Sequence, residues 1–299
     1  MIMGEPSDLL GGVYVANVSP MRDDDRCSLD VEAYLGHVTW LAGHGVRGIV
    51  PFGTNGEGPV IATGEKRTVL ERLFALDLPD GFQLVPTVAE GNLPDTLDQL
   101  AFLAGAPATA VLVLPPYYVK PVSAEGLELF YRRVLDATDH PVIVYHIPKY
   151  AVGVPAEVVG RLPVWGVKDS DGSPGYAEAV HEAGRGVLLG TEDDVPGGLR
   201  IAAGTISALA NVVPDLMVQL YDHVRAGRDD EAAALAGHLR QVRAMTKQHT
   251  SVAVLKRLAG ERQGRSLGTV RPPQLPLPSD YDAATALATA LDTHAGSRG

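Results

Sequence analysis

The chain has 299 residues but a single cysteine, Cys27. One thiol can form neither an intrachain disulfide nor a multi-cysteine metal site. So low a cysteine content is consistent with a protein of the reducing cytosol. Positive charge is also scarce, because 25 Lys and Arg stand against 36 Asp and Glu, which gives a net charge of -11. No Lys/Arg cluster supplies the phosphate neutralisation that nucleic-acid binding needs, so we expect no nucleic-acid partner.

Long hydrophobic runs are absent as well. None approaches the ~18 apolar residues of a membrane span, and the first ten residues carry Glu5 and Asp8 where a secretory signal carries Lys or Arg. We therefore expect a soluble cytoplasmic protein with no membrane partner. The composition is globular, with 45% hydrophobic residues and both signs of charge interspersed, and the length allows two domains or one large α/β barrel.

Short apolar runs bounded by Gly, Pro, Asn or Asp recur along the first two thirds of the chain. Runs so rich in β-branched residues are typical of parallel strands buried on both faces. Stretches with helical periodicity separate them, for example 29–44, starting near Ser28, and 123–138, starting at Ser123. The eight runs span residues 11–19, 46–53, 83–89, 110–116, 141–147, 164–170, 186–192 and 204–210.

Eight repeats of strand and helix predict an α/β fold, a (β/α)8 TIM barrel. The alternative is a doubly wound open sheet, but neither GxGxxG after the first strand nor GxxxxGK[ST] is present. After the eighth run only helical stretches follow, at 215–225, 229–259 and 279–293, with a Pro-rich link at 271–279. We predict a barrel domain over residues 1–212 and a C-terminal three-helix appendage over residues 213–299.

A lysine and a tyrosine end two neighbouring runs of the predicted barrel, where active sites lie. By strand alternation Lys168 faces the barrel interior with Gly166 and Ser170, while Asp169 points away. Burial lowers the pKa of a lysine and yields a neutral amine that attacks carbonyls. Tyr145, on a strand about 4.8 Å away, could reach that amine and move protons. The alternatives are a lysine that extends to water at the rim and an ordinary core tyrosine.

The loop after the second run reads FGTNGEGP. Gly53, Gly56 and Gly58 free its backbone, and Thr54 and Asn55 offer polar groups, so its N–H groups suit a small carboxylate. The loop could equally serve only to turn the chain.

A second polar segment, residues 192–194, is acidic. No histidine adjoins it and it precedes a helical stretch, so we predict helix capping there. The histidines lack ligand spacing such as HExxH, and we expect no metal.

Five motifs occur in an informative order: GTNGE (53–57), PPYY (115–118), YHIP (145–148), GVKDS (166–170) and the stretch from Gly190 to Asn211. Together they resemble the dihydrodipicolinate synthase and N-acetylneuraminate lyase family of class I, Schiff-base pyruvate aldolases. The resemblance covers essentially the whole chain.

The resemblance implies roles for particular residues. Lys168 would be the Schiff-base lysine and Tyr145 the proton-relay tyrosine. Tyr118 would enter the relay of a neighbouring subunit, which implies a homo-oligomer, either a dimer or a tetramer. The family uses no metal and no organic cofactor.

The resemblance also implies a binding site for the 2-oxo acid. Thr54 and Asn55, in the loop that begins at Gly53, would receive the pyruvate carboxylate. Gly190 and Ile206 would line the pocket around the lysine.

Three positions depart from the pattern of the synthases. Their arginine two residues after the YNxP motif is absent, since Lys149 and Tyr150 follow YHIP here. Neither side chain provides a bidentate guanidinium, although Lys149 could supply a point charge. Asn55 replaces a threonine of the synthases' proton relay, and an amide cannot pass a proton as a hydroxyl does. His146 replaces an asparagine.

We therefore expect a lyase that forms or cleaves a carbon–carbon bond between pyruvate and an aldehyde, acting on a 2-oxo-3-deoxy sugar acid or a 4-hydroxy-2-oxo acid. The first alternative is 4-hydroxy-tetrahydrodipicolinate synthase, which condenses pyruvate with aspartate semialdehyde. A dehydratase of deoxy sugar acids would use the same iminium. A non-catalytic barrel that binds 2-oxo acids is the alternative from another class.

Overall fold

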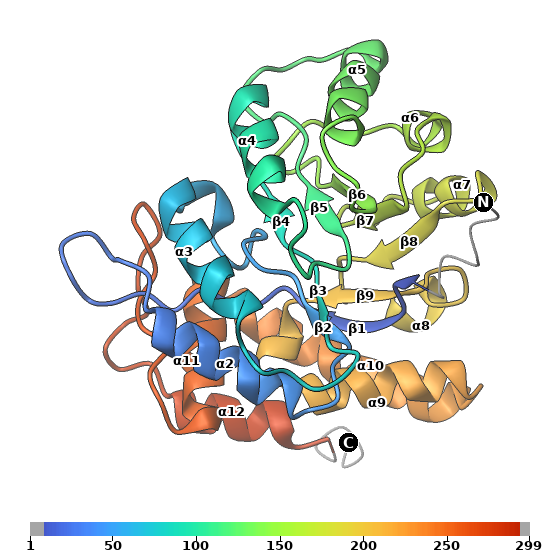
Figure 1. The fold of residues 1–299 in the computed structure, drawn as a ribbon. Helices are drawn as coiled ribbons and strands as arrows, with labels where there is room; N and C mark the ends of the chain where they lie inside the picture. Colours follow the sequence, from blue (N-terminus) through green and yellow to red (C-terminus); the bar gives the residue numbers. More distant parts are fainter. Residues whose placement is uncertain (1–8, 294–299) are drawn as a thin grey trace.

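A computed structural model describes residues 9–293. Glu5 and Asp8 lie outside the described residues, and so do residues 1–8 of the predicted barrel domain and residues 294–299 of the predicted appendage. All strands run parallel in one curved sheet, with helices on its outside (Figure 1). Each predicted run contains a strand, and the third run contains two. The strands are β1 (Gly12–Val15), β2 (Gly48–Ile49), β3 (Gln83–Leu84), β4 (Thr87–Val88), β5 (Val111–Val113), β6 (Val142–His146), β7 (Gly166–Asp169), β8 (Gly186–Leu189) and β9 (Gly204–Ser207).

The two ends of the sheet meet in the third run. The strand order is β3-β2-β1-β9-β8-β7-β6-β5-β4, and β3 and β4 are separated only by Val85 and Pro86. The Val85 N–H donates to the Ile49 carbonyl at 3.0 Å on one side, and the Pro86 carbonyl accepts from the Leu112 N–H at 3.0 Å on the other. Proline has no N–H to donate, which interrupts the strand at this point. The architecture is therefore α/β and TIM-barrel-like, as predicted.

Helices connect the successive strands and cover the outside of the sheet (Figure 1). Among residues 9–293, none is long and apolar enough to cross a membrane. The α-helices are α2 (Val31–Ala42), α3 (Thr63–Phe74), α4 (Leu93–Leu103), α5 (Ala124–Leu135), α6 (Ala156–Arg161), α7 (Tyr176–Glu182), α8 (Val195–Gly198), α9 (Pro214–Arg225), α10 (Asp229–Thr246), α11 (Ser251–Gln263) and α12 (Ala283–Leu291), and the short 3-10 helices are η1 (Gly58–Val60) and η2 (Leu209–Asn211).

Two helix starts test the capping signals in the sequence. Helix α5 follows Ser123, whose side chain accepts the Gly126 N–H, as predicted. Helix α2 starts later than predicted, because Asp30 caps it by accepting the Ala33 N–H, while the Ser28 hydroxyl bonds to the Asp24 carboxylate instead.

The helices after β9 differ in detail from the prediction. The expected helix over 229–259 is two helices, α10 and α11, separated at residues 247–250. No glycine or proline marks this break, so the composition could not reveal it. Helix α9 packs on β1, in the manner of the helices that cover the barrel. Helices α9 to α12, orange and red in Figure 1, gather on one side of the molecule. The boundary at residue 212 stays a prediction.

Side chains of the strands divide between two apolar layers. On β6, Ile143 and Tyr145 join the cluster inside the barrel, whereas Val142 and Val144 pack in the larger cluster under the helices. Each fully buried aliphatic side chain contributes about 1.5–3 kcal/mol to folding. The alternation fixes which residues of each strand face the interior, and therefore which can act on a ligand there.

Candidate active site

Lys168 lies inside the barrel, in the second half of β7. Its neighbour Val167 packs in the outer cluster, and only 2% of the lysine surface is exposed. Lys168 lies directly opposite Tyr145 in the pairing of β6 with β7, and its Nζ lies 3.1 Å from the Tyr145 hydroxyl. Asp169 points away, as predicted, and accepts the Asp171 and Gly172 N–H groups at 3.0 and 3.2 Å. The lysine is thus buried against a phenol and not against a carboxylate.

Tyr145 connects Lys168 to the loop after β2. Its hydroxyl lies 2.9 Å from the Thr54 Oγ1, so Thr54, Tyr145 and Lys168 form one hydrogen-bonded chain. Burial alone would raise the pKa of the Tyr145 phenol, but the Lys168 ammonium and the hydrogen bonds with Thr54, Lys168 and Ser170 hold that pKa below its ordinary value. A phenol in this position can exchange a proton with groups on either side of it.

The loop that carries Thr54 folds back on itself. The Gly58 N–H donates to the Gly53 carbonyl at 3.1 Å, and the Glu57 N–H donates to the Thr54 carbonyl at 3.1 Å. A Cβ at Gly58 would lie 1.7 Å from the carbonyl oxygen of Phe52, so this turn requires glycine. The half-buried Asn55 follows Thr54 in the same turn. The predicted carboxylate loop therefore adjoins the Lys168–Tyr145 pair.

The two predicted wall residues lie at the ends of neighbouring strands. Ile206 on β9 belongs to the cluster inside the barrel and is 1% exposed. The Gly190 N–H donates to the Asp169 carbonyl at 2.6 Å, just after β8. A Cβ at Gly190 would lie 2.1 Å from the Ser170 Oγ, so glycine permits Ser170 to approach Tyr145. Sequence reasoning missed a site role for Ser170, although alternation already placed it on the face of Lys168.

Tyr118 is the predicted site residue that lies apart from the others. It projects from the loop between β5 and α5, and 90% of its surface is exposed. Within one chain the structure does not bring it to the buried pair. Lys149 and Tyr150, in the position of the missing arginine, lie together on the surface, with the Lys149 Nζ 5.1 Å from the centroid of the Tyr150 ring.

His146 lies outside the barrel, on the other face of β6 from Tyr145. Its Nδ1 accepts the Val154 N–H at 3.2 Å and its ring stacks on Tyr176 with centroids 3.8 Å apart. Burial lowers the pKa of the imidazole, and the Asp169 and Asp171 carboxylates offset only part of that shift. His146 thus holds the segment that follows β6.

The acidic segment after β8 supplies two caps. Asp194 caps α8 by accepting the Gly197 N–H at 3.0 Å, which confirms the predicted role at this residue. Glu192 is buried and supplies the second cap. It accepts the Ser207 hydroxyl at 2.9 Å and the Ala208 N–H at 2.8 Å at the start of η2. Within residues 9–293, no three His, Cys, Asp or Glu gather as metal ligands.

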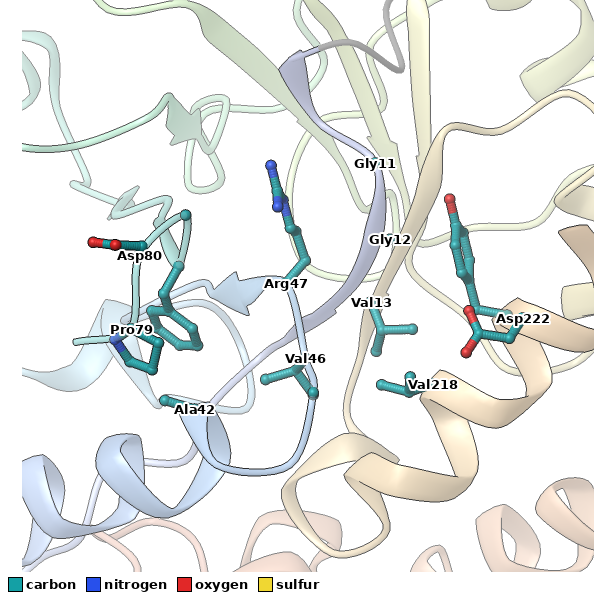
Figure 2. A pocket seen from close by; sticks show the side chains of 14 residues that line it. Gly11, Gly12, Val13, Ala42, Val46, Arg47, Pro79, Asp80, Val218 and Asp222 are labelled. Atoms are coloured by element: carbon teal, nitrogen blue, oxygen red, sulfur yellow. The ribbon is translucent and has the colours of Figure 1, made fainter.

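A cavity of about 270 Å³ lies at the opposite end of the barrel (Figure 2). Its lining comes from the start of β1 and the segments that precede β1, β2 and β3, including Gly11, Arg47 and Asp80, and from Val218 and Asp222 on α9. These are the amino ends of the strands, whereas Lys168 lies near a carboxyl end. The cavity is therefore separate from the candidate active site.

A buried amine held against a phenol inside a parallel barrel suits carbonyl chemistry, in which the amine forms an iminium that takes up electrons. These features define the class of lyases that act through a lysine Schiff base. The chain belongs to the dihydrodipicolinate synthetase family, whose family model matches residues 9–292.

Individual relatives agree with this assignment. An uncharacterized DapA-like lyase of Halobacterium salinarum is 34% identical over 292 residues, which cover 94% of this chain and 93% of the relative. A 4-hydroxy-tetrahydrodipicolinate synthase of Anaplasma marginale is 31% identical over 239 residues, which cover 77% of this chain and 78% of the relative. In fold, the chain matches a 2-keto-3-deoxygluconate aldolase variant of Sulfolobus solfataricus with a TM-score of 0.87 at 20% identity, over 95% of this chain and 97% of that one. The protein is an enzyme of the lyase class.

Proposed function

We propose that the protein is a class I lyase that cleaves a 4-hydroxy-2-oxo acid, such as a 2-oxo-3-deoxy sugar acid, to pyruvate and an aldehyde, or joins the two. The observation that carries the proposal is the chain of Thr54, Tyr145 and Lys168, with distances of 2.9 and 3.1 Å. It supports assigning the Schiff base to Lys168, proton transfer to Tyr145 and carboxylate binding to the loop at Thr54 and Asn55.

The reaction begins when the neutral Lys168 Nζ attacks C2 of the 2-oxo acid. The Tyr145 phenol donates a proton to the departing oxygen, which leaves as water, so an iminium and a Tyr145 phenolate form. The C3–C4 bond then breaks as the Tyr145 oxygen takes the proton of the 4-hydroxyl, so the C4 carbon leaves as an aldehyde and the bonding electrons form an enamine. Protonation of the enamine at C3 and addition of water to the iminium release pyruvate and restore the amine. Condensation follows the same steps in reverse.

A loop held against the relay supports the binding role of Thr54 and Asn55. Carboxylates bind well to backbone N–H groups in a tight turn, and a bound carboxylate would fix the substrate's C2 relative to the amine. Asn55 cannot pass a proton, so in this proposal it only binds substrate.

The second candidate is the synthase reaction with aspartate semialdehyde. The names of several relatives, including that of Anaplasma marginale, favour it. The absence of an arginine at positions 149 and 150 favours a sugar-acid substrate, because a carboxylate on the aldehyde would lack a bidentate partner there.

A direct comparison of the two reactions tests the proposal. Purified enzyme is incubated with 2-oxo-3-deoxy sugar acids while pyruvate release is followed, and separately with pyruvate and aspartate semialdehyde while consumption of the aldehyde is followed. Lys168→Ala is the control for both. The proposal expects Lys168-dependent cleavage of a sugar acid at least tenfold more efficient than the condensation. Efficient condensation without sugar-acid cleavage would instead establish the synthase.

We also propose that the enzyme works as a homo-oligomer in which Tyr118 contacts a second copy of the chain. Its 90% exposure and the 66% exposure of Val119 place two apolar side chains on the surface of the isolated chain. Sedimentation analysis should show a dimer or tetramer for the wild type. A monomeric wild type that retains full activity would refute this part of the proposal.

A further inference from the structure

The substrate loop is anchored by a buried ion pair with the C-terminal part of the chain. The Glu57 side chain is fully buried, and its Oε1 lies 2.5 Å from the Nζ of Lys256 on α11. The other oxygen, Oε2, accepts the Arg271 N–H at 3.0 Å, and the same Nζ donates to the Thr269 carbonyl at 2.5 Å. Two groups, the Lys256 Nζ and the Arg271 N–H, thus bind the Glu57 carboxylate at the end of the loop, and the Thr269 carbonyl holds the Lys256 Nζ.

The backbone of the loop needs such an anchor. Glu57 has a φ of 55° and Phe52 a φ of 60°, although neither is glycine. Left-handed conformations of this kind are uncommon for such residues and persist where the surrounding structure holds them. The Phe52 ring is buried and stacks on Tyr34, which holds the first end of the loop. The ion pair holds the second end.

Thr54 lies between these two fixed points. The Glu57 N–H donates to the Thr54 carbonyl at 3.1 Å, and the Thr54 hydroxyl bonds to Tyr145. A shift of Glu57 would therefore move Thr54 relative to Tyr145. Because effective catalysis depends on such placement to within about 1 Å, a small shift has a large effect.

A second buried ion pair, Lys66–Glu90, serves as the comparison for Lys256–Glu57. The Lys66 Nζ on α3 lies 2.6 Å from a Glu90 carboxylate oxygen, and the lysine side chain is 1% exposed, as that of Lys256 is. The polar contacts of the Lys66 side chain do not involve residues 53–57. The two lysines are matched in burial, and each forms an ion pair with a glutamate. They differ in their connection to the loop, and Lys256 also donates to the Thr269 carbonyl.

We propose that Glu57 and Lys256 are positioning residues, which hold Thr54 against Tyr145 and so set the affinity of the loop for the carboxylate of the 2-oxo acid. The role of the loop as the carboxylate site rests on the proposed function. The placement of the loop by the ion pair does not, and it can be measured separately.

The test compares Lys256→Met with Lys66→Met in two measurements. Hydrogen–deuterium exchange of the peptide that spans residues 52–58 reports the order of the loop. The pyruvate concentration that gives half-maximal borohydride-trapped adduct reports its affinity. We expect Lys256→Met to speed exchange in this peptide and to raise the half-maximal concentration tenfold or more, on the order expected for a misplaced binding group. Lys66→Met should leave both within twofold of wild type.

Equal changes in the two variants, or no change in Lys256→Met, would overturn the proposal. If Lys256→Met alone does not fold, the double variant Glu57→Gln/Lys256→Met removes both charges and must show the same two changes. If the wild type forms no adduct with pyruvate, the proposed function fails. The exchange measurement then still decides whether the ion pair holds the loop.

Discussion

The Tyr145 hydroxyl is the group whose removal tests the relay most sharply. Tyr145→Phe keeps the ring, whose centroid lies 4.2 Å from the Lys168 Nζ, and deletes only the oxygen between Lys168 and Thr54. Thr54, Lys168 and Ser170 then lose a hydrogen-bond partner, which costs about 1–3 kcal/mol of folding free energy. Loss of the proton-transfer group slows the step that it serves by about 10²–10⁴-fold.

Exchange of the pyruvate methyl protons with deuterium measures that step without any aldehyde. Formation of the enamine removes a C3 proton, so the proton NMR signal of pyruvate decays in D2O at a rate that the enzyme sets. We expect Tyr145→Phe to slow this decay by about 10²–10⁴-fold while the amine of Lys168 still forms the iminium.

Tyr131→Phe is a matched control, since Tyr131 is also fully buried and its hydroxyl donates to the Val113 carbonyl at 3.1 Å, away from the lysine. It should lose stability on a similar scale and keep its exchange rate within twofold. An exchange rate in Tyr145→Phe within tenfold of wild type would refute the assignment of the relay.

Three further predictions follow from the site and its supports. Gly190→Ala should destabilise the fold by about 1–3 kcal/mol, because its Cβ would lie 2.1 Å from the Ser170 Oγ, and a thermal denaturation midpoint equal to that of wild type would contradict this. Burial raises the pKa of the Tyr145 phenol, but Lys168 and the hydrogen bonds lower it by more, so the difference between ultraviolet titrations of wild type and Tyr145→Phe should show one phenol that ionises below the ordinary tyrosine value. In that pH range the unfolded chain holds more protons than the folded one, so the free energy of unfolding should rise as pH increases. A fall in that free energy would disprove the shift. Ser123→Ala should cost about 1 kcal/mol in urea unfolding through loss of the α5 cap, without changing adduct formation.

Local patterns in the sequence were sufficient for the strands and for the Lys168–Tyr145 pair. Period-two alternation decides which side chains face the interior, and consecutive strands of a barrel lie side by side, so Tyr145 at the end of β6 was expected to be within reach of Lys168 at the end of β7. The structure confirms that expectation at 3.1 Å.

Contacts across the barrel could not be predicted in the same way. Thr54 and Tyr145 come from strands that are not neighbours, and their distance depends on how the closed sheet is filled. The Glu57–Lys256 pair joins residues 199 positions apart, for which no local pattern exists. The role of Tyr118 depends on a second copy of the chain and stays a prediction.

Formation of the Schiff base on Lys168 can be measured directly. The protein is incubated with pyruvate, reduced with borohydride and digested, and the modified lysine is located by mass spectrometry beside a Lys168→Ala control. We expect one pyruvyl-derived unit on Lys168 and none in the control. An adduct on another lysine, an adduct that persists in Lys168→Ala, or no adduct in the wild type would contradict it.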